Sequence, residues 1–146
     1  MILWVCSPPL PRFAHARYRQ EMLDANGKNN EDRVMIVSTL CLDCKSIEDW
    51  PSFHAEFCRV FGFPSFYGYN MDAWIDCMSS LDAPEDGLSS VHCSCGMVLT
   101  LDLKNMKEFK ERCQEQYDAL IECAAFVNWR RIATGGSSVL ALSFHE

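Results

Sequence analysis

Three short apolar runs, separated by longer stretches of helical periodicity, constrain what this chain can fold into more than any other feature. The runs are RVMIVSTLCL over residues 33–42, MVLTLDL over residues 97–103 and VLALSF over residues 139–144. Such runs are typical of buried strands, and we expect the first to be buried on both faces. Helices between successive strands favour right-handed crossovers and parallel pairing. The sequence therefore predicts an α/β domain with a three-stranded parallel sheet.

About four helices are predicted to pack on this sheet. In SIEDWPSFHAEFCRVFG, which begins at Ser46, aromatic and aliphatic residues recur every three or four positions on one helix face. Ser46 and Asp49 have the spacing of a cap with an acid at its third position, and Pro51 is tolerated in a first turn. A second helix is expected from Asn70, as its cap, to about Leu81.

The longest helical stretch, MKEFKERCQEQYDALIECAAFVNWRRI, precedes the third apolar run. Its length indicates two helices, with a break expected near Gln116. The TGGSS segment that follows supplies the glycines that end a helix.

The 146 residues suit one domain with a single core, which we place at residues 33–146. Residues 1–32 are polar after a short apolar start and are expected to be a flexible extension, or the product of a start assigned too far upstream. The apolar runs are shorter than the roughly 18 residues that a membrane span needs. Nine cysteines, an odd number, indicate free thiols and a reducing, cytoplasmic compartment.

Acidic residues are concentrated in the middle of the chain, which has a net charge of −7. Between Arg59 and Lys104 there is no Lys or Arg, yet six acids lie there: Asp72, Asp76, Asp82, Glu85, Asp86 and Asp102. Such a field repels nucleic acid and anionic membranes and attracts cationic partners. A role in solubility alone is the alternative interpretation.

The segment FPSFYGYNMDAWIDCM, residues 63–78, combines an aromatic, glycine-containing loop with two acids. On a helix capped by Asn70, Asp72 and Asp76 lie one turn apart on one face, with no basic residue nearby in the sequence. Like charges at this spacing oppose each other by a few tenths of a kcal/mol. The arrangement favours a docking site for cations, and a plain solvated helix face is the alternative.

This segment resembles the signature of the barstar family of intracellular ribonuclease inhibitors. The matching residues, in order and without a gap, are Pro64, Tyr67, Gly68, Asn70, Asp72, Ala73, Asp76 and Cys77. A looser resemblance extends over residues 34–146. It implies a three-stranded parallel sheet with helices, and a protein without catalytic activity or cofactor that is monomeric when free.

The resemblance also implies a binding site for a cationic ribonuclease, formed by Phe66, Tyr67, Gly68, Asn70, Asp72, Ile75 and Asp76. The acids would imitate RNA phosphates, with Asp76 as the central anchor and Asp72 as the second. Phe66 would stack on the enzyme, and Gly68 would let the loop approach closely. Asn70 is interpreted as a helix cap, and Met71 and Trp74 as core residues.

This chain departs from the family pattern at four positions. Phe66 replaces a tyrosine, Tyr69 a glutamate and Ile75 a tryptophan. Arg130 aligns where the family has an acid late in its last helix. The target is therefore expected to be a different ribonuclease, or not a ribonuclease at all.

Two other functions are possible on the residues alone. Cys41 and Cys44 have zinc-like or redox-like spacing, and His92, Cys93 and Cys95 could complete a metal site. A parallel sheet, however, places these two groups at opposite ends of neighbouring strands. Paired carboxylates can also serve acid–base catalysis, but no histidine, lysine or phosphate-binding loop is placed beside them in the sequence.

Overall fold

The three-stranded parallel sheet that the sequence predicts is present. The computed structural model describes residues 34–145, so the expectations for residues 1–32 lie outside it. Strands β2 (Thr39–Asp43), β4 (Leu99–Lys104) and β5 (Leu140–Phe144) form the sheet in the order β2-β4-β5. Both pairings are parallel. The predicted fold class is confirmed, with β4 as the central strand.

The first apolar run forms two strands rather than one. β1 (Met35–Ile36) pairs in parallel with β3 (Val91–His92) as a separate two-stranded sheet, and β2 follows. The chain changes partner at Ser38, whose carbonyl accepts a hydrogen bond from the Thr100 backbone N–H at 2.9 Å. The expectation of one continuous strand was therefore wrong.

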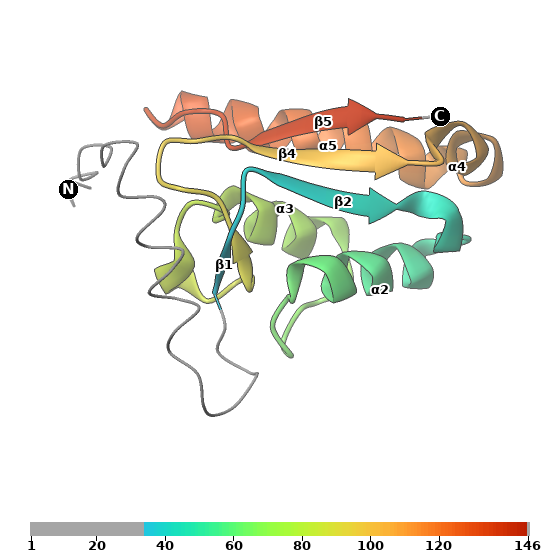
Figure 1. The fold of residues 1–146 in the computed structure, drawn as a ribbon, viewed down its shortest axis with the longest axis horizontal. Coiled ribbons are helices and arrows are strands. Elements are labelled where there is room, and N and C mark those ends of the chain that lie inside the picture. Colours follow the sequence, from blue (N-terminus) through green and yellow to red (C-terminus); the bar gives the residue numbers. More distant parts are fainter. Residues whose placement is uncertain (1–33, 146) are drawn as a thin grey trace. The chain divides into compact units, whose positions relative to one another are not determined.

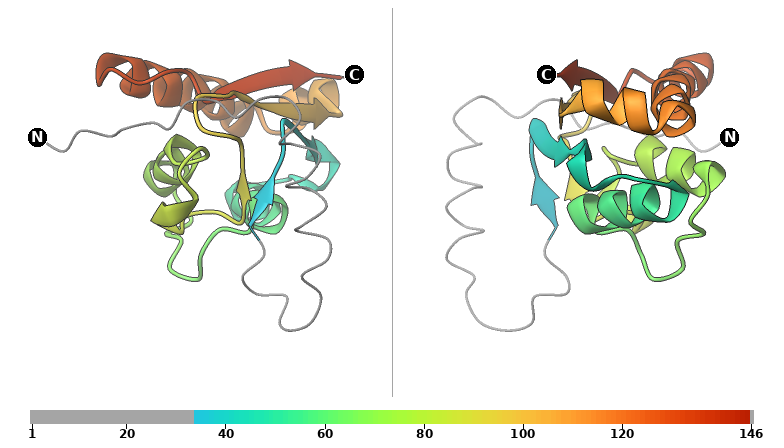
Figure 2. Two further views of the ribbon diagram at one scale, coloured as in Figure 1. Left: turned by 60° about the vertical axis from the view of Figure 1, so that its left-hand side comes forward. Right: turned by 90° about the vertical axis from the view of Figure 1, so that its right-hand side faces the viewer.

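Within the described residues, four α-helices cover the sheet: α2 (Trp50–Phe61), α3 (Met71–Ser79), α4 (Met106–Arg112) and α5 (Gln114–Ala133). Two single 3-10 turns, η1 (Cys44–Ser46) and η2 (Pro84–Asp86), complete the elements. The helices lie on one side of the three-stranded sheet (Figures 1 and 2). The expectation of about four helices is confirmed. None of the helices among these residues is long and apolar enough to cross a membrane.

The core lies between the helices and one face of this sheet. Leu99, Leu101 and Leu103 of β4 are fully buried, while the residues between them are only partly buried. In β2, Leu42 is buried and its neighbour Cys41 is exposed. The strands thus alternate with a period of two, as expected when one face is covered. The prediction that the first run is buried on both faces was wrong.

The cap of helix α2 lies three residues after the predicted cap, Ser46. Asp49 is the cap: its side chain accepts a hydrogen bond from the Ser52 N–H at 2.8 Å, and the Ser52 hydroxyl accepts one from the Asp49 N–H at 2.9 Å. Ser46 instead ends the preceding 3-10 turn. Pro51 lies in the first turn, as expected. Gly62 ends the helix in the left-handed conformation, with φ of 64°.

The break between α4 and α5 lies at Cys113, three residues before the predicted Gln116. Cys113 is buried and has non-helical backbone angles, φ of −134° and ψ of 59°, and its thiol donates to the Ile47 carbonyl over 3.5 Å. Arg112 donates to the same carbonyl at 2.9 Å. These contacts fix the chain against the segment after η1, which is a tertiary cause that helical periodicity does not report.

Candidate functional site

A buried tyrosine, Tyr67, anchors the loop between α2 and α3 to helix α2. The Tyr67 side chain is only 6% exposed, and its hydroxyl lies 2.7 Å from Nδ1 of His54 on α2. Burial raises the pKa of Tyr67 and lowers the pKa of His54. Tyr67 therefore supports the loop, and little of its surface is accessible to a partner.

Asn70 joins this loop to α3 through both ends of its side-chain amide. Its Oδ1 accepts a hydrogen bond from the Ala73 N–H at 2.9 Å, which confirms the predicted helix cap. Its Nδ2 donates to the Gly68 carbonyl at 3.1 Å. A Cβ at Gly68 would lie 2.9 Å from that Nδ2, so a larger residue there would displace the Asn70 amide from this position.

Aromatic side chains are exposed on the outer surface of the loop. Phe66 is 72% exposed and Tyr69 is 59% exposed. Tyr69 has a φ of 52°, which L-residues rarely adopt, and its ring lies 5.3 Å from the Tyr67 ring. Ile75, the remaining predicted apolar contact, is partly buried against the core. Its neighbour Trp74 is fully buried, as predicted.

Asp72 and Asp76 both lie exposed on α3, but Asp76 has a cationic partner within the chain. Nη1 and Nη2 of Arg130, on α5, each donate to Asp76 Oδ1 over 3.3 Å. Nη2 of Arg130 also donates to the Ser79 hydroxyl at 2.6 Å. The local sequence shows no basic residue near these acids, because the partner of Asp76 is 54 residues away in the chain.

Two other acids between Arg59 and Lys104 also contact basic side chains. Asp82 binds Nη2 of Arg131 at 2.6 Å, with both side chains mostly buried. Asp102 lies 2.5 Å from Nε2 of His145. Asp72, Glu85 and Asp86 remain exposed. Folding thus places basic residues from the end of the chain on part of the acidic segment, and the free acidity centres on fewer residues than the sequence suggests.

A second aromatic pair, which the sequence reading missed, lies on the exposed side of α5. Phe126 is 42% exposed and Trp129 is 63% exposed, and their rings stack with centroids 5.6 Å apart. Trp129 directly precedes Arg130 in the chain. The signal was available, since on a helical projection Trp129 falls opposite the buried Val127 and Phe126 falls outside the buried face. Arg130 stands out in the sequence as a departure from the family pattern, but its contact with Asp76 had no local signal.

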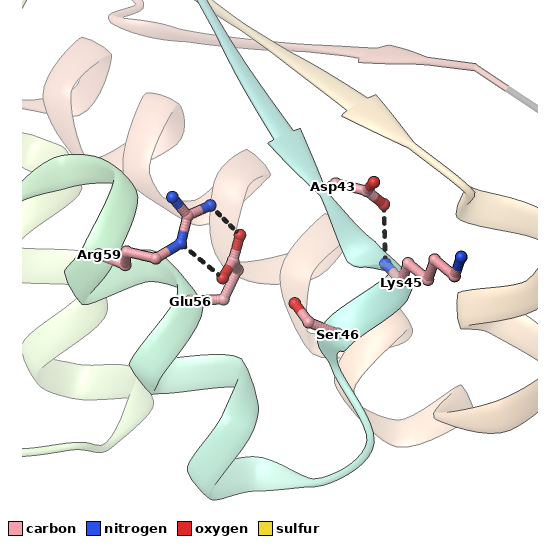
Figure 3. A pocket seen from close by; sticks show the side chains of 5 residues that line it. All are labelled: Asp43, Lys45, Ser46, Glu56 and Arg59. Carbon is pink, nitrogen blue, oxygen red and sulfur yellow. Dashed lines mark hydrogen bonds and ion pairs between the residues drawn. The ribbon is translucent and has the colours of Figure 1, made fainter.

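A shallow hollow lies elsewhere on the surface (Figure 3) and is lined by Asp43, Lys45, Ser46, Glu56 and Arg59. Its acids are already engaged. Glu56 accepts a hydrogen bond from Arg59 Nε at 3.0 Å, and the Lys45 N–H donates to Asp43 at 2.9 Å. This second hydrogen bond holds the pKa of Asp43 below its usual value. None of the predicted site residues lines this hollow.

The cysteines form no metal site among residues 34–145, where no group of three or more His, Cys, Asp or Glu side chains could hold an ion. Seven carry free thiols: Cys41, Cys44, Cys58, Cys77, Cys93, Cys113 and Cys123. Cys95 is disulfide-bonded, so the expectation of free thiols was wrong at that position. Burial raises the pKa of Cys44 to about 12 and that of Cys93 to about 11, which disfavours the reactive thiolate.

An exposed acidic face of α3 thus adjoins an aromatic loop that hydrogen bonds from Tyr67 to His54 and from Asn70 to Gly68 hold in place. The family model for barstar, described as a barnase inhibitor, matches residues 37–134. The chain belongs to the barstar family. The matched range contains the loop, α3 and α5, so the acids and Arg130 all lie within it. A search of the curated proteins finds no match.

Proposed function

We propose that this chain is an intracellular inhibitor of a cationic ribonuclease, which binds and occludes the enzyme's active site and so protects the cell that makes it. One observation carries the proposal. Phe66, Asp72 and Asp76 are exposed together on a loop and helix that Asn70 and Tyr67 hold in one conformation. Such preorganisation lowers the entropy cost of binding.

The acids would act by occupying the positions of RNA phosphates. A ribonuclease binds its substrate through Arg, Lys and His side chains, and a carboxylate on a rigid helix offers those cations an alternative, unreactive partner. We assign Asp76 as the central anchor and Asp72 as the second. Phe66 would pack on the rim of the active site, Gly68 would permit close approach, and Ile75 would flank the acids.

The ion pair between Asp76 and Arg130 does not prevent this role. The Asp76 side chain is 64% exposed, and an exposed ion pair typically contributes about 0–1 kcal/mol. An enzyme that presents several cations can therefore displace Arg130 from Asp76. The barstar family match supports the class of target, and the exposure of the acids supports the binding face.

The test is capture followed by an activity measurement. The immobilised chain is exposed to lysate of the cell that produces it, and captured protein is assayed for ribonuclease activity with and without added inhibitor. We expect a captured ribonuclease whose activity is lost on adding the parent chain and is retained on adding Asp76→Ala. Capture without inhibition, or equal inhibition by both chains, would contradict the proposal.

A further inference from the structure

Arg130 places a positive charge inside the acidic face where the proposed partner would bind. Its guanidinium lies between α5 and α3 and contacts both Asp76 and Ser79. The Arg130 side chain is 39% exposed, whereas that of the adjacent Arg131 is 19% exposed. Arg131 serves the fold, because it binds Asp82 and the carbonyls of Ser79 and Ser137. Arg130, in contrast, can be reached by a partner.

The contacts of Arg130 hold its charge near the acids even when Asp76 is engaged elsewhere. Its hydrogen bond to the Ser79 hydroxyl, at 2.6 Å, is shorter than those to Asp76, at 3.3 Å. The same hydroxyl donates to the Ile75 carbonyl at 2.6 Å, so Ser79 is itself fixed on α3. A partner that takes Asp76 from Arg130 therefore still faces the guanidinium.

We propose that Arg130 determines which ribonucleases this chain can inhibit. It disfavours an active site that is lined only by cations and favours one that places a carboxylate opposite the end of α5. Like charges facing each other across an interface suppress binding of the wrong partner, and such repulsive elements are a common source of specificity. This inference rests on the proposed function and adds a second, acidic requirement to the surface of the partner.

The test uses barnase, the ribonuclease that the family description names, as the binding partner. Binding is measured for the parent chain, Arg130→Glu and Arg130→Ala. Arg59→Glu is the matched control, because it changes the net charge equally but lies on α2, where Arg59 pairs with Glu56. We expect Arg130→Glu to bind barnase at least about tenfold more tightly than the parent, with Arg130→Ala in between and Arg59→Glu within about threefold of the parent.

A gain for Arg130→Glu no larger than that of Arg59→Glu, or no binding of barnase by any variant, would overturn the inference. Circular dichroism checks that each variant is folded. If Arg130→Glu does not fold, Arg130→Ala against an Arg59→Ala control decides on the same criterion.

The captured native ribonuclease separates this inference from the proposed function. Against that enzyme, Arg130→Glu should weaken binding at least about tenfold, because it places two acids face to face. One substitution with opposite effects on the two enzymes supports the inference. If the native enzyme is inhibited by the parent and released by Asp76→Ala, yet is indifferent to Arg130→Glu, the inference fails and the proposed function stands.

Discussion

At the residue scale, Asp76 pairs with Arg130 within the chain and is proposed to pair with the cations of a ribonuclease in the complex. Asp76→Ala removes an exposed ion pair that contributes about 0–1 kcal/mol to stability. It also relieves repulsion with Asp72, so the thermal midpoint should move by only a few degrees. Binding of the captured ribonuclease should fall by about 2–5 kcal/mol, because the enzyme's cations are then left buried and unpaired.

Calorimetry and a competition assay measure these two effects separately. Asp72→Ala should weaken binding in the same way but less. Glu85→Ala, in the exposed η2 turn, is the control and should leave both quantities unchanged. Loss of the fold in Asp76→Ala would make Asp76 a structural acid and would contradict its role as an anchor.

His54 makes stability depend on pH near neutrality. Burial lowers the pKa of His54 in the folded protein below its ordinary value of 6.5. The unfolded chain therefore binds more protons in this range, so stability is full above about pH 6.5 and falls as the pH drops through the lowered pKa. The measurement is the free energy of unfolding in urea between pH 5 and 7.5.

His54→Gln is the comparison for this pH dependence, because glutamine can still bond Tyr67 but does not titrate. The parent should lose more stability than His54→Gln between pH 7.5 and pH 5. The two proteins differ at no other residue, so the comparison isolates His54. Parallel pH profiles for the two proteins would contradict the assignment.

Single residues differ in how far the sequence could predict their roles. Asn70 was predictable as a cap, because capping depends on residues within one turn of it. Tyr67 was assigned to the partner surface, yet its hydroxyl bonds His54, 13 residues away. Arg130 reaches Asp76 only through the packing of α3 on α5. The candidate site was thus visible where its contacts are local and hidden where they are tertiary.

At the scale of elements, the clamp at the start of α3 should link stability to binding. Asn70→Ala removes the cap and the hydrogen bond to Gly68, at a cost of about 1 kcal/mol and a fall in the thermal midpoint of about 3–5 °C. Asp49→Ala removes the cap of α2 and should cost about the same. Only Asn70→Ala should also weaken ribonuclease binding, because it loosens the loop that carries Phe66.

Melting curves and affinities of the two cap variants together test this prediction. Equal affinity for the ribonuclease in both variants would show that the cap stabilises α3 without organising the loop. The pair is informative because each variant loses one acceptor from the first turn of a helix, and only one of the helices carries the proposed site.

The elements themselves were largely predictable, since their signals are local. Short apolar runs predicted β4 and β5, and apolar spacing, a capping residue and segment length predicted the four helices. The errors lie at boundaries that tertiary contacts decide. The first run splits at Ser38, where the chain stops pairing with β3 and begins to pair with β4. Helix α5 starts after Cys113 because the thiol of that residue is hydrogen-bonded to the Ile47 carbonyl. Neither contact leaves a periodic trace in the sequence.

At the scale of the whole molecule, the net charge of −7 should steer a cationic enzyme toward the inhibitor. Association should slow as salt rises, because the Debye length shrinks to about 8 Å at physiological ionic strength. Dissociation should change less. Stopped-flow mixing of inhibitor with the captured ribonuclease, at several salt concentrations, measures both rates. An association rate that does not vary with salt would contradict steering.

The exposed Trp129 also gives the molecule an optical signal of its own. Trp74 is buried and Trp50 partly buried, so of these three indoles Trp129 is the one most open to water and to a dissolved quencher such as acrylamide. Because it adjoins Arg130, an enzyme covering the end of α5 should shift its fluorescence to shorter wavelength and shield it from the quencher. Complex formation can therefore be followed by intrinsic fluorescence without a label. Trp129→Phe is the control, because it removes that part of the emission.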